Sequence, residues 1–80
     1  MTERAAWSWL LVGGRDGAQL ARCERLPLAA VHTVALLRLV CLDEVPLGAR
    51  VAYVTGFVRG YRAVRERVDI NEETDIKRAR

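Results

Sequence analysis

The side chains that could support catalysis are few in this 80-residue chain and stand far apart. There is one histidine, His32, and one serine, Ser8, and no motif pairs a nucleophile with a base. His32 and Asp43 would share one side of a helix, but eleven residues correspond to about 16 Å, too far for a catalytic dyad. The acidic residues form no pairs at a fixed spacing. The sequence therefore predicts that the protein is not an enzyme and uses no cofactor.

A metal site would require residues that are distant in the sequence to converge. The candidate ligands are Cys23, His32, Cys41 and Asp43, and no two of them have the short spacing of a structural zinc site. We therefore expect no bound metal. The two cysteines lie in apolar surroundings without a nearby partner, so we expect buried free thiols. Together with residues 1–7, which show no signal-peptide pattern, they favour a cytoplasmic location.

The stretch from Pro46 to Val68 carries two different faces at helical spacing. One side is a broad apolar stripe, and the opposite side is a row of small residues only. Glycine inside a helix costs about 1 kcal/mol relative to alanine, so two glycines in that row indicate close packing against another backbone. We expect the row to face the preceding helix or a second copy of the chain. The apolar side comprises Leu47, Val51, Val54, Phe57, Val58, Tyr61, Val64 and Val68, and the small side comprises Ala49, Ala52, Gly56, Gly60 and Ala63.

The first third of the chain favours a β-hairpin. Residues 7–12 (WSWLLV) are aromatic and apolar and alternate between two faces, whereas residues 19–24 (QLARCE) alternate loosely. Residues 13–17 between them (GGRDG) are rich in turn residues. Two short strands around a glycine-rich turn are typical of a hairpin.

A helical interpretation of the same region is the alternative. Thr2 could cap a helix that ends at Gly13, and Asp16 could begin a second helix that ends before Pro27. The aromatic content of the first segment and the density of turn residues after it favour the hairpin.

Residues 26–42 (LPLAAVHTVALLRLVCL) form the clearest predicted helix, apolar on nearly every side. The run is shorter than the ~20 residues of a membrane-spanning helix and contains Arg38, so we expect no membrane segment. A short turn, residues 43–46, joins it to the next helix and predicts an antiparallel helix pair.

We therefore expect a small α+β domain over residues 1–68, with a β-hairpin followed by an antiparallel helix pair. An all-α domain of three to four helices is the alternative. Residues 69–80 are dense in charge of both signs and are expected to form a flexible tail, although Asn71 could cap a short helix.

Nucleic-acid binding is one functional hypothesis, since the formal net charge is +3. Residues 51–57 resemble the first helix and turn of a helix-turn-helix element, which would place a recognition helix after them. The resemblance breaks where such elements carry buried apolar residues and this chain has Arg62 and Arg65. It would define a degenerate element over residues 47–67, with Arg59, Arg62, Arg65 and Arg67 as the DNA-contacting residues.

Protein binding is the hypothesis that the sequence supports better. Hydrophobic residues make up 51% of a chain too short to bury a large core, so apolar surface remains for a partner or a second copy. We expect a non-enzymatic regulator or inhibitor that occludes another protein, of the kind that phages and mobile elements encode, and that also forms a homodimer. The expected interface residues are Trp7, Trp9, Gly56, Gly60, Tyr61, Arg59 and Arg62.

Overall fold

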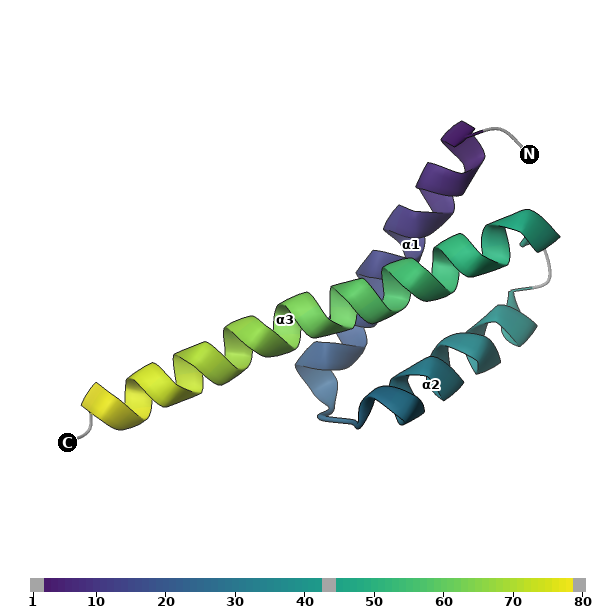
Figure 1. The fold of residues 1–80 in the computed structure, drawn as a ribbon. Helices are drawn as coiled ribbons and strands as arrows, with labels where there is room; N and C mark the ends of the chain where they lie inside the picture. The colour runs from purple at the N-terminus through teal and green to yellow at the C-terminus, as the bar shows by residue number, and fades with distance from the viewer. Residues whose placement is uncertain (1–2, 43–44, 79–80) are drawn as a thin grey trace.

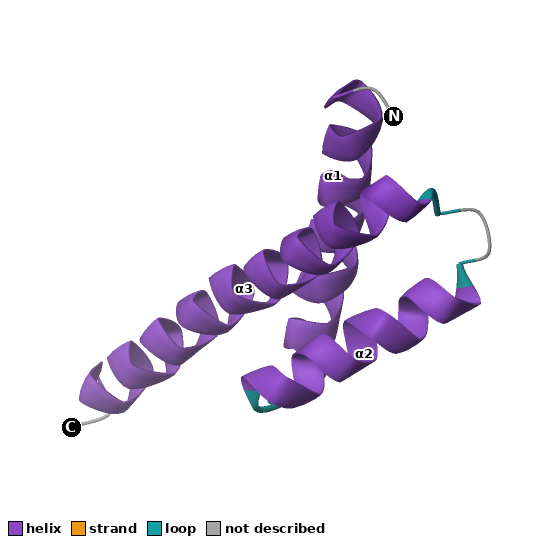
Figure 2. Cartoon of the chain, turned by 45° about the vertical axis from the view of Figure 1, so that its right-hand side comes forward, coloured by secondary structure: helices purple, strands orange, loops and turns teal. Residues whose placement is uncertain are grey.

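The computed structural model describes the backbone of residues 3–42 and 45–78 and the side chains of residues 4–42 and 45–69. Within these ranges the chain forms three α-helices and one short 3₁₀ turn: α1 (Glu3–Cys23), α2 (Leu28–Cys41), η1 (Leu47–Ala49) and α3 (Arg50–Arg78). The long helix α3 is crossed by α1 and flanked on another side by α2 (Figure 1). The described part of the chain contains no strand (Figure 2).

The prediction of a β-hairpin in the first third of the chain is wrong, and so is the predicted α+β class. Residues 3–23 form one helix that passes through Gly13, Gly14 and Gly17 without a break. None of the described glycines has a positive φ angle, so these residues make no turn. The all-α alternative is confirmed, with one helix before Pro27 rather than two.

The reason for the glycines of α1 is the close approach of α3. At four glycines, two on each helix, an added Cβ atom would overlap a backbone carbonyl oxygen of the facing helix. The helix backbones therefore touch directly, as in small-residue packing motifs. The four overlaps pair Gly13 with Tyr53, Gly17 with Phe57, Gly56 with Leu10, and Gly60 with Gly14.

The packing role predicted for Gly56 and Gly60 is thus confirmed, but the partner differs from the expected one. The small-residue row of α3 meets α1, which was predicted as a hairpin, rather than the helix before it or a second copy. Spacing within α3 could reveal the row, whereas its partner depends on residues about forty positions earlier in the sequence.

The antiparallel helix pair is confirmed in α2 and α3 (Figure 1). Pro27 takes an extended conformation (φ −65°, ψ 152°) as the residue before α2. Pro46 precedes η1, and its carbonyl oxygen accepts a hydrogen bond from the backbone N–H of Ala49 at 2.9 Å. Proline suits both positions because each stands just before its helix, where the missing N–H removes no intrahelical hydrogen bond. The acidic turn residues 43–44 lie outside the described part.

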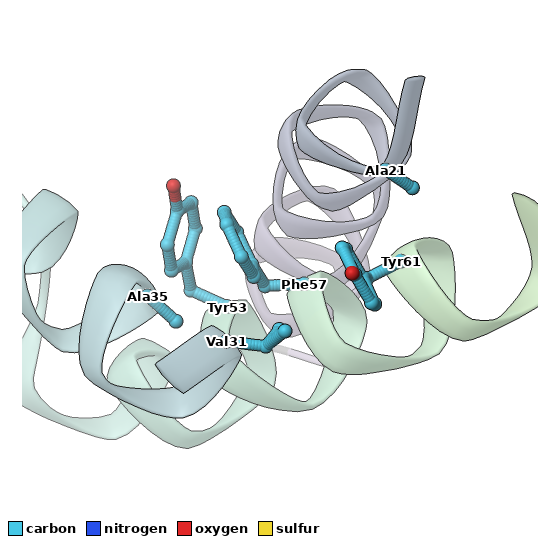
Figure 3. Close-up of a cluster of buried hydrophobic side chains, with 6 residues drawn as sticks. All are labelled: Ala21, Val31, Ala35, Tyr53, Phe57 and Tyr61. Atoms are coloured by element: carbon cyan, nitrogen blue, oxygen red, sulfur yellow. The ribbon is translucent and has the colours of Figure 1, made fainter. Parts of the chain in front are cut away.

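The core lies where the three helices meet (Figure 3). Tyr53 and Phe57 of α3 are fully buried, with ring centroids 6.1 Å apart. Trp9 of α1 approaches Tyr53 edge-on at a centroid distance of 6.4 Å, a favourable aromatic geometry. Because only a few side chains reach this core, the domain buries little apolar surface. The central cluster comprises Ala21, Val31, Ala35, Tyr53, Phe57 and Tyr61.

The connection between α1 and α2 is fixed by one phenol. The backbone N–H of Leu26 donates to the hydroxyl oxygen of Tyr61 at 2.6 Å. That hydroxyl lies 3.2 Å from each of the carbonyl oxygens of Glu24 and Leu26, to which it can donate. Arg65, one turn further along α3, donates to the carbonyl oxygen of Ala21 at 3.3 Å. These bonds satisfy backbone groups at the end of α1 that the helix itself leaves open.

The backbone of α3 continues as a helix to Arg78, through much of the segment predicted as a tail. The division of the chain at residue 68 stays a prediction. The chain is elongated, with a radius of gyration of 14.7 Å where about 11.6 Å is typical of a compact domain of this length. None of its described helices combines the length and apolar character needed to cross a membrane.

Candidate functional site

The two side chains considered for acid–base or nucleophilic chemistry are both exposed and satisfied within their own helices. The hydroxyl of Ser8 donates to the carbonyl oxygen of Arg4 at 3.1 Å. The Nδ1 atom of His32 lies 3.1 Å from the carbonyl oxygen of Leu28. Neither contact joins a nucleophile to a base, so this pair of residues forms no catalytic arrangement.

The cysteines differ from the prediction. Cys23 and Cys41 are free but exposed, so the expectation of buried thiols is wrong. Each is the last residue of its helix. Asp43, the fourth candidate ligand, lies outside the described residues. Among the residues that are described, no three His, Cys, Asp or Glu side chains converge as a metal site would require.

A part-buried hydrogen bond between two side chains joins α1 to α3. The Tyr53 hydroxyl donates to Asp16 Oδ2 at 2.7 Å. Burial of the phenol, and next the hydrogen bond and negative charge of Asp16, raise the pKa of Tyr53 well above its ordinary value, while Arg38 of α2 acts in the opposite sense. The guanidinium carbon of Arg38 also lies 5.8 Å from the ring centroid of Phe57. The phenol stays protonated at neutral pH and serves as a structural hydrogen-bond donor.

Most of the residues expected at a protein interface lie inside the folded domain instead. Gly56, Gly60 and Tyr61 are covered by α1 and by the α1–α2 connection. Trp9 is half-buried against Tyr53. Trp7 is 64% exposed and remains available to a partner.

The arginines of the helix-turn-helix hypothesis do not share one face. α3 is continuous from residue 50 onward, so the turn that the resemblance predicts within residues 51–57 is not formed. Arg59, Arg62 and Arg67 are exposed, but Arg65 is largely buried and holds Ala21 and Asp69. Arg65 therefore serves the fold. Arg59 and Arg62 are neighbours on α3, whereas Arg67 lies about 140° around the helix from Arg62.

A different surface, which the sequence interpretation missed, follows the outer side of α1. Residues 4, 11, 15 and 22 fall on one line of a helix because steps of seven and eleven residues return to the same side. Asp16, an acidic residue of α1 whose side chain is described, faces Tyr53 instead. Reading the region as a strand hid this periodicity. We call this surface the α1 outer face; it consists of Arg4, Trp7, Leu11, Arg15 and Arg22, all exposed.

A second surface is an apolar groove between α2 and α3, on the side of α3 that α1 leaves open. The cavity has a volume of about 680 Å³. Arg50 and Thr55 are its polar lining residues. The nearly uniform apolar character of residues 26–42 was the sequence signal for it. The apolar lining of this α2–α3 groove is Leu36, Leu39, Val40, Leu42, Val51 and Val54.

Comparison of the chain with models of protein families, with curated proteins and with solved structures finds no match. The α1 outer face and the α2–α3 groove are therefore the features from which a function is inferred.

Proposed function

We propose that this chain is a non-enzymatic protein-binding module that regulates or inhibits a partner protein by covering part of its surface. The observation that carries the proposal is the α1 outer face. Trp7 and Leu11 are 64% and 68% exposed, one helical turn apart, and the exposed Arg4 and Arg15 flank them along the helix. Tryptophan and arginine are the residue types most enriched at binding hot spots, and an apolar centre with a polar rim is the usual anatomy of an interface.

The charge of the α1 outer face indicates an acidic partner. Arg4, Arg15 and Arg22 are exposed on this face, and the formal net charge of the whole chain is +3. Such an excess attracts an acidic protein surface and raises the rate of encounter with it. The exposed Trp7 and Leu11 side chains favour a protein over a phosphate backbone, because they need an apolar partner to leave water. A reducing, cytoplasmic compartment would suit the two exposed thiols, and small size alone suggests a phage or mobile-element regulator.

The proposal is tested by capture followed by reconstitution. The wild-type chain, a Trp7→Ala/Leu11→Ala variant and a Leu37→Ala control are used to capture proteins from the cells that express the chain. Leu37 is a matched control, because it is 61% exposed on α2, away from the α1 outer face. A protein retained by wild type and control is then purified, and its affinity for all three is measured by titration calorimetry.

We expect an acidic partner whose affinity falls by on the order of 100-fold in the double variant and stays unchanged in the control. Equal binding by all three chains would overturn the role of the α1 outer face. A parallel titration with random duplex DNA covers the competing hypothesis, a small DNA-binding regulator. Binding at low salt that is lost steeply at high salt would favour that alternative, because phosphate contacts release counterions.

A further inference from the structure

The α2–α3 groove leaves apolar side chains in water on both of its walls. Val40 on α2 is 77% exposed, and Val51 on α3 is 73% exposed. Leu36 and Leu42 extend the same surface along α2. Leu47, one turn before Val51 along the chain, is also 77% exposed. Strongly exposed apolar side chains that gather at one groove are typical of an interaction surface.

The total surface of the chain supports the same conclusion. The accessible area is 6098 Å², whereas about 4,900 Å² is typical of a folded monomer of 9.0 kDa. Part of the excess belongs to the end of α3, which extends past the other helices (Figure 1). A standard interface buries about 800 Å² on each partner, which is within this excess. The groove and its rim are the apolar surface available for such burial.

We propose that a second copy of this chain fills the α2–α3 groove and forms a two-fold symmetric dimer. In such a dimer each copy presents the same patch, and the apolar side of α2 enters the groove of the other copy. Two α2–α3 pairs would then pack as a four-helix arrangement, with α1 of each copy on the outside. The α1 outer face stays free, so this proposal is independent of the proposed function.

The character of the groove favours a second copy over an occasional partner. Its described lining contains a single charged residue, Arg50, and permanent homodimer interfaces are likewise depleted of charge. The α1 outer face, with its arginines, has the mixed character of a surface that also exists free in solution. A domain of this length with a small core also gains the most from oligomerisation, which supplies the apolar burial that one copy lacks.

Analytical ultracentrifugation of the full chain over the micromolar range, at low and at high salt, tests the dimer. The variants are Val40→Glu and Val51→Glu, one on each wall of the groove, and the matched control is Leu11→Glu on α1. All three positions are strongly exposed in one copy, so each variant should fold alone. Circular dichroism and urea unfolding check that each variant does so.

We expect a salt-insensitive wild-type dimer, because apolar burial is screened little by ions. Each groove variant should raise the dissociation constant by on the order of 100-fold, since burying an unpaired carboxylate is costly, and Leu11→Glu should leave it unchanged. A wild-type chain that stays monomeric would overturn the proposal, and so would a dimer that survives both groove variants. Leu11→Glu should abolish partner binding and preserve the dimer. Val40→Glu should disrupt the dimer and preserve partner binding. The two proposals can therefore fail independently of each other.

Discussion

The two helix contacts of α3 are built on opposite principles. Against α1, glycines let the backbones touch, and a Cβ atom on Gly13 or Gly17 would overlap carbonyl oxygens of α3. Against α2, side chains fill the space, and Val31 and Ala35 of α2 belong to one buried cluster with Tyr53 and Phe57 (Figure 3). The first contact leaves no room between the helices. The second opens into a groove with a volume of about 680 Å³.

This difference separates the part of the molecule that specifies the fold from the part that is open to association. Backbone contact tolerates almost no change, because carbonyl groups cannot move aside as the end of a flexible side chain can. Where α2 and α3 meet through side chains, apolar atoms stay exposed to water and available to another chain. Phe57 belongs to both contacts and connects them, since it lies under Gly17 of α1 and beside Arg38 of α2.

The largest expected loss of stability comes from adding one atom at Gly17, in the α1–α3 contact. Gly17→Ala would place a Cβ atom over the carbonyl oxygen of Phe57 and 3.0 Å from its Cα atom, so the helices must separate. We expect the free energy of unfolding to fall by about 3 kcal/mol. Urea unfolding followed by circular dichroism measures the change.

Gly14→Ala is the matched control for this variant. Its added Cβ atom would lie 3.6 Å from the carbonyl oxygen of Gly56, an ordinary contact distance. We expect no loss of stability, and a gain of up to about 0.5–1 kcal/mol, because alanine is the better helix former. Equal effects of the two substitutions would contradict direct backbone contact at Gly17.

A smaller effect is expected where α3 holds the α1–α2 connection. Tyr61→Phe removes the hydroxyl that accepts the Leu26 N–H and leaves that donor without a partner in a half-buried site. We expect a loss of about 2 kcal/mol in the free energy of unfolding, and faster amide exchange near residues 24–26. If the loss is no larger than for removing the hydroxyl of an exposed tyrosine, water can replace this hydrogen bond.

Tyr53→Phe probes the polar link between α1 and α3. Loss of the bond to Asp16 should cost about 1 kcal/mol near neutral pH. The pKa of Tyr53 is raised in the folded chain, whereas in the unfolded chain it has its ordinary value near 10. Above about pH 10 the folded chain therefore keeps a phenol proton that the unfolded chain loses. Wild-type stability should therefore be fully present below about pH 10 and decline as the pH rises further.

The variant provides the control for that pH dependence. Because phenylalanine does not titrate, Tyr53→Phe should lose less stability between about pH 9 and pH 11 than the wild type does. Urea unfolding at both pH values measures the difference. Parallel curves for the two chains would mean that Tyr53 does not carry the effect.

The smallest expected effect lies on the outer side of α2. Leu37 is 61% exposed and contributes little to the core of one copy. Leu37→Gln should change the free energy of unfolding by less than about 0.5 kcal/mol. A loss of several times that amount in thermal or urea unfolding would show that α2 is covered in solution beyond the groove itself.

Several features followed from the sequence because they depend on neighbouring residues. The helix predicted over residues 26–42 is observed as Leu28–Cys41, with Pro27 before it, and the short turn after it does give an antiparallel pair. The packing role of Gly56 and Gly60 could be read from their spacing, since interior glycines cost helix stability unless a close contact offsets the cost. Exposure of the cysteines could not be read in this way, because it depends on where each helix ends relative to the others.

The sequence by itself determined an all-helical second half, the small-residue row of α3 and the scarcity of catalytic groups. Only the tertiary structure decided that residues 3–23 are a helix. Gly13 and Gly17 have turn-forming character locally, and their place in α1 is explained by contacts with Tyr53 and Phe57, forty residues later in the chain. The same contact exposes Trp7 and Leu11 on the α1 outer face and leaves the α2–α3 groove open. Local propensity is a weak signal, and here long-range backbone packing overrides it.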